Sequence, residues 1–176
     1  LWIGDATGHG APAALLTSAA RAVASVIQGG PPLSPGQAMG ILNRAICETS
    51  KGKMMMTFAL IAIDKKTGLL TYSNASHEPP MILRGQCQEI SRNDFLALTE
   101  VNNPRLGENY SSHFKEGKIQ LEPGDRLVLY TDGVMDVKSP EQKTWGERRF
   151  VKALSASMME SRDPGQSVTT VVQSLT

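Results

Sequence analysis

Hydrophobic positions in the first fifty residues follow the spacing of two amphipathic helices. In residues 11–28, apolar side chains recur at the intervals of a buried helix face. This predicted face consists of Leu15, Leu16, Ala19, Ala22, Val23, Val26 and Ile27. Ser34 is typical of a helix N-cap, so we predict a second helix that ends near residues 50–52. Its apolar stripe consists of Met39, Leu42, Ala45 and Ile46.

After residue 54 the pattern changes to short apolar runs of strand length. Residues 55–64 form a nearly continuous apolar run, and a turn at 64–68 predicts a hairpin with a return strand at 69–74. Further strands are predicted at residues 1–5, 81–84, 126–130 and 167–175, and a third helix at 146–159. Residues 91–118 are polar and rich in turn formers, so we expect a long loop with little regular structure.

Runs of strands beside paired helices predict an α+β fold with antiparallel sheet, not the alternating order of a doubly wound fold. At 176 residues the chain corresponds to one domain, which we predict to span residues 1–176. The chain opens inside a predicted strand and has neither an initiator Met nor a signal sequence. We therefore expect it to be an N-terminally incomplete piece of a longer polypeptide.

Charge and composition narrow the function classes. The 18 Lys and Arg residues nearly balance 17 Asp and Glu residues, leaving a net charge of +1. This balance argues against a nucleic-acid binder or a polybasic membrane binder, because both need clustered positive charge. Cys47 and Cys87 form neither a CxxC motif nor a disulfide framework. We expect a reduced, cytoplasmic setting.

Two aspartates, Asp5 and Asp132, share a local setting. Each follows an apolar predicted strand and is followed within a few residues by glycine. A carboxylate in this setting suits Mg²⁺ or Mn²⁺, which prefer oxygen ligands and keep several waters. The alternative is that each aspartate only forms a turn, because Asp-Gly is a common turn sequence. The residues alone leave both interpretations open.

The Gly8-His9-Gly10 loop precedes the first predicted helix, where a helix N-terminus can bind phosphate. The loop matches neither a Walker A motif nor a dinucleotide-binding motif, and no residue that would read a base or a ribose is identifiable. A nucleotide-binding module therefore has little support. The histidines at 9, 77 and 113 lack zinc-ligand spacing. For His77, which lies in a polar turn, we predict a loop-stabilising hydrogen bond.

Three motifs in the order of the chain carry a resemblance to a known family. They are residues 4–14 (GDATGHGAPAA), 73–80 (SNASHEPP) and 121–136 (LEPGDRLVLYTDGVMD), followed by 145–148 (WGER). Together they resemble the SpoIIE/RsbU-type branch of the metal-dependent, type 2C serine/threonine phosphatases. The family patterns are G-D-V-S-G-H-G-x-x-A-A, N-A-G-H-x-P-P, P-G-D-x-L-x-x-Y-T-D-G-x-x-E and F-G-x-x-R.

The resemblance implies a β-sandwich of two antiparallel sheets flanked by helices, with two Mn²⁺ or Mg²⁺ ions at one end. The ions activate a bridging water that attacks phosphoserine or phosphothreonine, without a covalent intermediate. By motif, Asp5 would bridge both metals, the main-chain carbonyl of Ala6 would hold one metal, and Asp132 would hold the other. The loop residues near the metals would be Gly8, His9, Gly10 and Gly133.

The same resemblance implies partners. Family members act on phosphorylated anti-sigma-factor antagonists of the STAS type, in bacterial partner-switching pathways that regulate sigma factors. It also implies a sensor domain upstream in the parent chain, and we expect no nucleic-acid partner.

The sequence departs from the family pattern in two places that concern metal. The first metal motif, G-G-D-x-x-D, precedes the strand at which this chain begins, so we expect the first strands to be absent. Where the family has D-D-x-T, this chain has Gln166-Ser167-Val168-Thr169. A catalytically degenerate domain that serves as a docking or regulatory module is therefore the alternative to an active phosphatase. We further expect weak metal binding by residues 1–176 alone, and self-association along an unpaired sheet edge. Two milder departures are Ser76 for glycine and Asp136 for glutamate.

Overall fold

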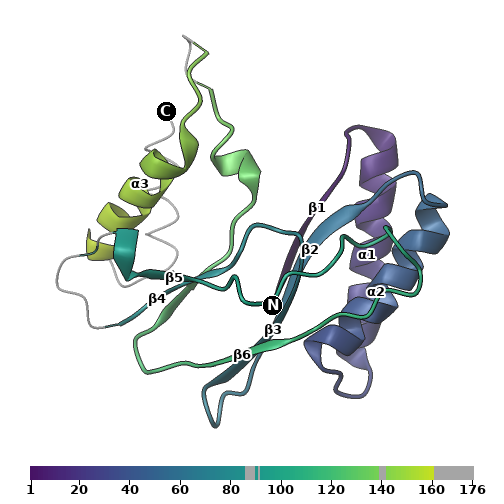
Figure 1. Ribbon diagram of the computed structural model, residues 1–176, viewed down its shortest axis with the longest axis horizontal. Coiled ribbons are helices and arrows are strands. Elements are labelled where there is room, and N and C mark those ends of the chain that lie inside the picture. The colour runs from purple at the N-terminus through teal and green to yellow at the C-terminus, as the bar shows by residue number, and fades with distance from the viewer. Residues whose placement is uncertain (86–89, 91, 139–141, 161–176) are drawn as a thin grey trace. The chain divides into compact units, whose positions relative to one another are not determined.

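The computed structural model describes residues 1–85, 90, 92–138 and 142–160 (Figure 1). These residues form two compact units, each with its own antiparallel sheet and its own hydrophobic cluster. The first unit contains residues 1–79 and 98–121, and the second contains the described parts of residues 80–97 and 122–160. Antiparallel pairing and helices grouped along the sequence confirm the predicted α+β class.

The first unit is built on a four-stranded sheet in the order β1-β2-β3-β6, with every neighbouring pair antiparallel. Its strands are β1 (Trp2–Ala6), β2 (Met56–Ile63), β3 (Leu69–Ala75) and β6 (Gly117–Gln120). The predicted hairpin is confirmed as β2 and β3, in a register that places Phe58 opposite Ala75. Asp64 initiates its turn, because a side-chain oxygen accepts the N–H of Lys66 at 2.8 Å.

Two helices, α1 (Ala11–Gly29) and α2 (Pro35–Ser50), lie beside this sheet in Figure 1. Ser34 is the predicted N-cap of α2: its hydroxyl accepts the N–H of Gln37, and the Gln37 side chain accepts the N–H of Ser34. The helices bury apolar side chains against the sheet and each other. The cluster includes Leu16, Ala20, Ala24, Met39, Leu42, Ile46, Met56, Phe58 and Leu106.

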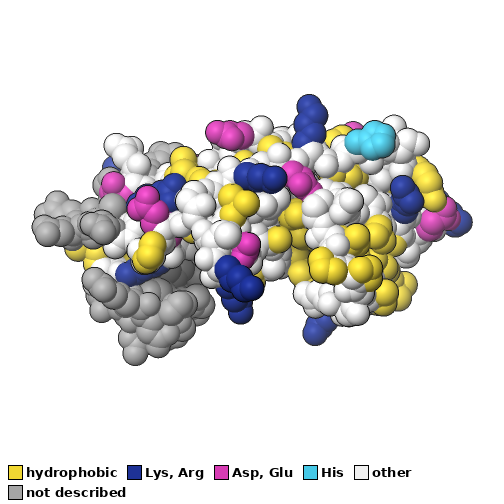
Figure 2. All heavy atoms as spheres, turned by 90° about the horizontal axis from the view of Figure 1, so that it is seen from below, with side chains coloured by type: hydrophobic (Ala, Val, Ile, Leu, Met, Phe, Trp, Pro, Cys, Tyr) yellow, Lys and Arg dark blue, Asp and Glu magenta, His cyan; other side chains and the backbone are white. Residues whose placement is uncertain are grey.

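The buried face of α1 is narrower than predicted. Leu16, Ala20 and Ala24 are buried, whereas Leu15 is 69% exposed and Val26 is 77% exposed. At 3.6 residues per turn, both exposed residues lie about 80–100° around the helix from the line of Leu16, beyond the strip that faces α2 and the sheet. Figure 2 shows hydrophobic side chains on the surface on the side where α1 and α2 lie.

The second unit combines a three-stranded sheet with one long helix. The sheet has the order β5-β4-β7 and consists of β5 (Phe95–Ala97), β4 (Met81–Leu83) and β7 (Arg126–Val128). The predicted third helix is confirmed as α3 (Gly146–Glu160). It packs Phe150, Val151 and Leu154 into one cluster with Met81, Leu83 and Val128. The predicted strand at 126–130 is shorter than expected.

A salt bridge fixes the turn that precedes β7. The Arg84 guanidinium lies 2.6 Å from the nearly buried Asp125 carboxylate, which also accepts the N–H groups of Gly85 and Glu122. Arg84 follows β4, so these bonds join the two neighbouring strands of this sheet at their ends. Asp125 of the third sequence motif therefore has a structural role.

The predicted long loop with little regular structure over residues 91–118 agrees with residues 98–116 and missed the short elements at its two ends. The segment contains a 3₁₀ turn η1 (Arg92–Asp94) and β5, and β6 begins at its end. Leu106 also exchanges two backbone hydrogen bonds with Met56 and is fully buried. Strands of three or four residues are too short to produce a recognisable alternation in a polar sequence.

Some predictions concern residues outside the described ranges. The predicted last strand at 167–175, the Gln166-Ser167 pair and Cys87 all belong to this group. Among the described helices, none has both the length and the apolar character needed to cross a membrane.

Candidate functional site

Strand β1 presents Asp5 in an exposed position within the strand, opposite Thr57 of β2. The residue before it has to be glycine: a Cβ on Gly4 would overlap the Phe58 ring and lie 2.7 Å from the Thr57 carbonyl oxygen. The Trp2 ring stacks on the Phe58 ring with their centroids 5.8 Å apart. The close β1–β2 contact therefore sets the backbone position of Asp5. The prediction placed Asp5 at the end of a strand, and β1 extends one residue further, to Ala6.

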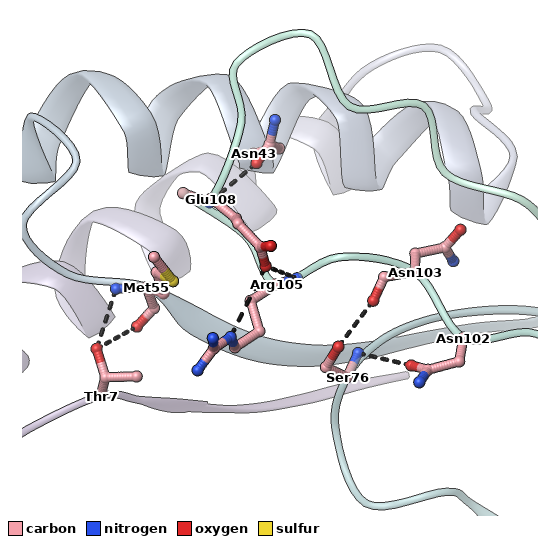
Figure 3. A network of polar contacts seen from close by, with 9 residues as sticks. Thr7, Asn43, Met55, Ser76, Asn102, Asn103, Arg105 and Glu108 are labelled. Atoms are coloured by element: carbon pink, nitrogen blue, oxygen red, sulfur yellow. Dashed lines mark hydrogen bonds and ion pairs between the residues drawn. The ribbon is translucent and has the colours of Figure 1, made fainter.

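The loop after β1 is fixed by Thr7. Its N–H donates to the Met55 carbonyl oxygen at 2.9 Å, and its hydroxyl donates to that same oxygen at 3.0 Å. In return, the Met55 N–H donates to the Thr7 hydroxyl oxygen at 3.0 Å (Figure 3). Ala6, whose carbonyl is a predicted metal ligand, is buried next to this clamp. The clamp holds the end of β1 against the start of β2.

Two glycines complete the connection to α1. Gly8 has φ of +86° and Gly10 has φ of +77°, a region that favours glycine over residues with side chains. Gly10 is the N-cap residue of α1, and His9 between the glycines is exposed. Gly8, His9 and Gly10 thus lie in the same loop, three to five residues after Asp5 in the sequence.

Thr57 and His77, which the sequence analysis did not assign to the site, are linked to the main chain of Asp5. The Nδ1 atom of His77 is 2.9 Å from the Thr57 hydroxyl oxygen, which is 3.4 Å from the main-chain oxygen of Asp5. His77 is only 6% exposed. Asn74 holds its main chain, accepting the His77 N–H and donating to its carbonyl oxygen, each at 2.9 Å. The available signal was a single threonine inside the apolar run of β2.

The turn that carries His77 is also held from the 102–103 segment. Ser76 has φ of +53°, which explains why the family pattern has glycine there. Its N–H donates to Asn102 Oδ1 at 3.1 Å, and its hydroxyl donates to the Asn103 carbonyl oxygen at 2.8 Å (Figure 3). Asn103 is buried, and its side-chain amide bonds the Asn74 carbonyl oxygen. The prediction of a loop-stabilising hydrogen bond concerned His77, and it agrees with the His77 N–H, which donates to Asn74 Oδ1 within this turn.

Asp132 lies in the second unit. It is the first residue of a 3₁₀ turn, η2 (Asp132–Val134), where strand β7 has already ended at Val128. Its main-chain oxygen accepts the N–H groups of Met135 and Asp136 at 2.8 and 3.0 Å, and its side chain is exposed. As predicted, Asp132 follows an apolar strand, but β7 is shorter than expected and ends at Val128, so three residues separate it from Asp132. Gly133 is the second, exposed residue of the same turn.

The structure thus groups the predicted site residues into two sets. Asp5, Ala6, Gly8, His9 and Gly10 lie together in the first unit, and Asp132 and Gly133 lie in the second. Their pairing stays a prediction. Among the described residues, no three His, Cys, Asp or Glu side chains gather into a potential metal-binding group. Neither the Asp5 nor the Asp132 carboxylate forms an ion pair with another described residue, so each is available as an oxygen ligand.

Comparison with known proteins finds phosphoserine phosphatases among the relatives of this chain. The chain is 30% identical to the phosphoserine phosphatase RsbU of Bacillus subtilis over 138 residues, which cover 78% of this chain and 39% of RsbU. The matched segments cover between 16% and 39% of the curated relatives, so the chain spans less than half of their length.

Solved structures share the fold. The SiaA-PP2C domain of Pseudomonas aeruginosa matches with a TM-score of 0.74 at 24% identity, over 98% of this chain and 66% of that domain's chain. The catalytic domain of the serine/threonine protein phosphatase PstP, in complex with two manganese ions, matches with a TM-score of 0.70 at 15% identity. That match covers 99% of this chain and 80% of the PstP chain. The predicted type 2C phosphatase fold is thereby confirmed.

The family comparison covers the whole sequence. The sequence model of the stage II sporulation protein E family matches residues 1–176. The alignment to RsbU also covers most of this chain. Together the two matches confirm the resemblance drawn from the three motifs. The chain therefore belongs to the SpoIIE family, in the SpoIIE/RsbU-type branch of the type 2C serine/threonine phosphatases.

Proposed function

We propose that this chain is part of a metal-dependent protein phosphatase that hydrolyses phosphoserine or phosphothreonine in bacterial partner-switching signalling. The observation that carries the proposal is the position of Asp5. Its carboxylate is exposed and unpaired among the described residues, while its backbone is fixed by the β1–β2 contact and by the Thr7–Met55 clamp. A metal ligand needs this combination of a free oxygen and a rigid support.

The donor atoms fit Mn²⁺ or Mg²⁺. Two carboxylates, Asp5 and Asp132, and the main-chain carbonyl of Ala6 are hard oxygen ligands, which these ions prefer. We propose that they contribute to a site for two ions, the number named for PstP. When bound, the ions supply a water of lowered pKa as the nucleophile.

The chain's own residues have supporting tasks in this proposal. Thr57 and Gly4 keep the Asp5 backbone close to β2, and Thr7 keeps the following loop closed against Met55. Gly8, His9, Gly10 and Gly133 shape the loops next to the two carboxylates. None of these roles needs a covalent enzyme intermediate, in agreement with the absence of a nucleophile motif from the sequence.

The proposed substrate is a phosphorylated anti-sigma-factor antagonist of the STAS type. We also propose that the parent chain carries a sensor domain upstream of this domain, and that this phosphatase domain is cytoplasmic. The relative RsbU is a phosphoserine phosphatase, which supports a phosphoserine-containing substrate, and the STAS type is proposed from the family resemblance. A second copy of the chain is a further proposed partner. β1 has no strand on its outer side among the described residues, and an unpaired edge favours strand addition.

A catalytically degenerate docking or regulatory module is the second candidate. It is favoured by Gln166-Ser167, which stand where the family pattern has two metal-binding aspartates. Both residues lie outside the described ranges, so the structure does not bear on them.

The deciding experiment measures Mn²⁺-dependent hydrolysis of p-nitrophenyl phosphate and of a phosphorylated STAS protein by the full-length parent. Asp5→Asn and Asp132→Asn should each lower kcat roughly a hundredfold or more, because each removes a charged metal ligand. Asp64→Asn, an exposed aspartate in a hairpin turn, is the matched control and should retain activity. Activity that survives Asp5→Asn contradicts the proposal, and binding of the phosphoprotein without turnover supports the docking module.

A further inference from the structure

A groove lies between residues 36–44 of α2 and residues 110–116, within the first unit, and has a volume of about 730 Å³. It begins at the N-terminal end of α2. The residues that line it include neither Thr7, Met55 nor any residue of the loop next to Asp5.

Both walls of the groove are fixed by hydrogen bonds. The buried Asn43 on α2 donates to the Asn109 carbonyl oxygen at 2.9 Å and accepts the Gly107 N–H at 2.9 Å. At the other end, the Gly36 N–H donates to the Glu116 carboxylate at 2.6 Å. A preformed groove binds a ligand without first having to be ordered.

Exposed apolar side chains line this groove. Ile41 on α2 is 42% exposed and Tyr110 on the opposite wall is 53% exposed. Gly40 lies beside Ile41 in the sequence, in the interior of α2, and a Cβ built on it would meet nothing within 4 Å. Glycine in a helix interior costs about 1 kcal/mol relative to alanine, and no neighbouring atom would crowd a Cβ here and so require glycine. Because Gly40 has no side chain, the groove surface at this position has room for a bound peptide segment.

The charged groups available in the groove are basic. Arg44 and His113 line it, and neither forms an ion pair with another described residue. The one acidic lining residue, Glu116, already accepts the N–H of Gly36. Tyrosine and arginine together are typical of the residues that dominate binding energy at protein interfaces. A single arginine with one histidine is too little positive charge for a nucleic acid.

We propose that this groove docks a segment of the phosphoprotein substrate that combines acidic with apolar side chains. Arg44 and His113 pair with the acidic groups, and Ile41 and Tyr110 contact the apolar ones. The inference rests on the proposed function for its occupant and adds a docking site whose lining contains none of the predicted metal-site residues. Docking of this kind lowers KM for the phosphoprotein and leaves the hydrolysis of a small phosphate ester unchanged.

The first test measures binding of a short fluorescein-labelled peptide of alternating Glu and Leu, by fluorescence anisotropy. Gly40→Leu fills the groove from a position with free space, so the fold is retained. Gly29→Leu is the matched control, because its Cβ also meets nothing within 4 Å. We expect Gly40→Leu and Arg44→Glu to weaken peptide binding at least tenfold, and Gly29→Leu and Arg21→Glu to leave it unchanged. Equal effects of variant and control, or equal binding of a Lys–Leu peptide, would overturn the proposal.

The second test separates this docking site from the proposed function. In the full-length parent, Arg44→Glu should raise KM for a phosphorylated STAS protein about tenfold without changing the rate on p-nitrophenyl phosphate. A lowered rate on the small ester would overturn the docking role. If the parent hydrolyses neither substrate, the proposed function fails, and the peptide titration still decides on the groove.

Discussion

The Nδ1 atom of His77 lies 2.9 Å from the hydroxyl oxygen of Thr57, the residue directly opposite Asp5 in the β1–β2 pair. When His77 donates from Nδ1, the Thr57 hydroxyl is free to donate to the Asp5 main-chain oxygen at 3.4 Å. The turn motif around His77 and the strand that carries Asp5 are thus joined through one side chain. Through this connection, the second sequence motif supports the strand that carries the first.

Thr57→Val tests this connection. The substitution keeps the shape of the side chain but removes the hydroxyl, so the buried His77 ring loses this partner. We expect the free energy of unfolding to fall by about 1–2 kcal/mol, measured by urea denaturation. Thr71→Val on β3 is the control, because Thr71 is also half-buried and its hydroxyl bonds no other described residue. A similar loss in both variants would contradict a specific role for the Thr57 hydroxyl.

The hairpin turn between β2 and β3 should give a pH-dependent stability. Hydrogen bonds from the Lys66 N–H, and then from Thr67, lower the pKa of Asp64 below its ordinary value. The carboxylate therefore contributes stability above its unfolded pKa, and this contribution disappears as pH falls through the lower folded pKa. Asp64→Ala should lower the melting temperature at neutral pH and have little effect in strong acid. An effect that is equal at both pH values would contradict this assignment.

Ser76 offers a test of backbone conformation. Ser76→Ala removes the hydrogen bond to the Asn103 carbonyl oxygen but keeps the left-handed backbone, so we expect a loss of about 1 kcal/mol. Ser76→Gly loses the same bond but relieves the left-handed strain, which costs about 1 kcal/mol or more for residues with a Cβ. It should therefore be close to the wild type in chemical denaturation. If the alanine variant is as stable as the glycine variant, the strain at this position is negligible.

The burial of Cys47 predicts slow alkylation. Burial, and then the Glu48 carboxylate, raise the pKa of the Cys47 thiol above its ordinary value. Less thiolate is present at a given pH, so iodoacetamide should react more slowly than with free cysteine, and faster as pH rises. In a Cys87→Ser background, Glu48→Gln should speed the reaction and Glu122→Gln should not. Unchanged kinetics in Glu48→Gln would contradict the influence of that carboxylate.

The sequence predicted the long elements and the short apolar strands β4 and β7, and it missed the short strands of the polar segment. The helices α1 and α2, the Ser34 cap and the β2–β3 hairpin were recognisable because each repeats its pattern over many residues or has a specific start signal. β5 and β6 were not, because three or four residues in a polar segment carry no clear period. Leu15 and Val26 were assigned to a buried face because apolar spacing does not show how wide the covered strip is.

The candidate site was predictable only in part. Motif resemblance pointed to Asp5, Ala6 and the following loop, which are consecutive in the chain, and their role at a metal site stays a prediction. The contact between Thr57 and His77 was not predictable, because it joins residues 20 positions apart through the register of a hairpin and a turn held by Asn74. The pairing of Asp5 with Asp132 stays a prediction, since it rests on the family motifs alone.

Gly4→Ala should disturb the position of Asp5 without touching its carboxylate. A Cβ at Gly4 would overlap the Phe58 ring, and the Thr57 carbonyl oxygen leaves it only 2.7 Å. The strand pair must separate locally, so we expect a loss of about 1–3 kcal/mol in the free energy of unfolding. Because Gly4 adjoins Asp5, Mn²⁺ affinity of the full-length parent, measured by calorimetry, should fall as well. Gly29→Ala at the end of α1, where a Cβ meets nothing within 4 Å, is the control and should be at least as stable as the wild type. A Gly4→Ala protein that unfolds like the wild type would show that β1 and β2 tolerate a wider spacing, and the close contact would then no longer explain how Asp5 is held.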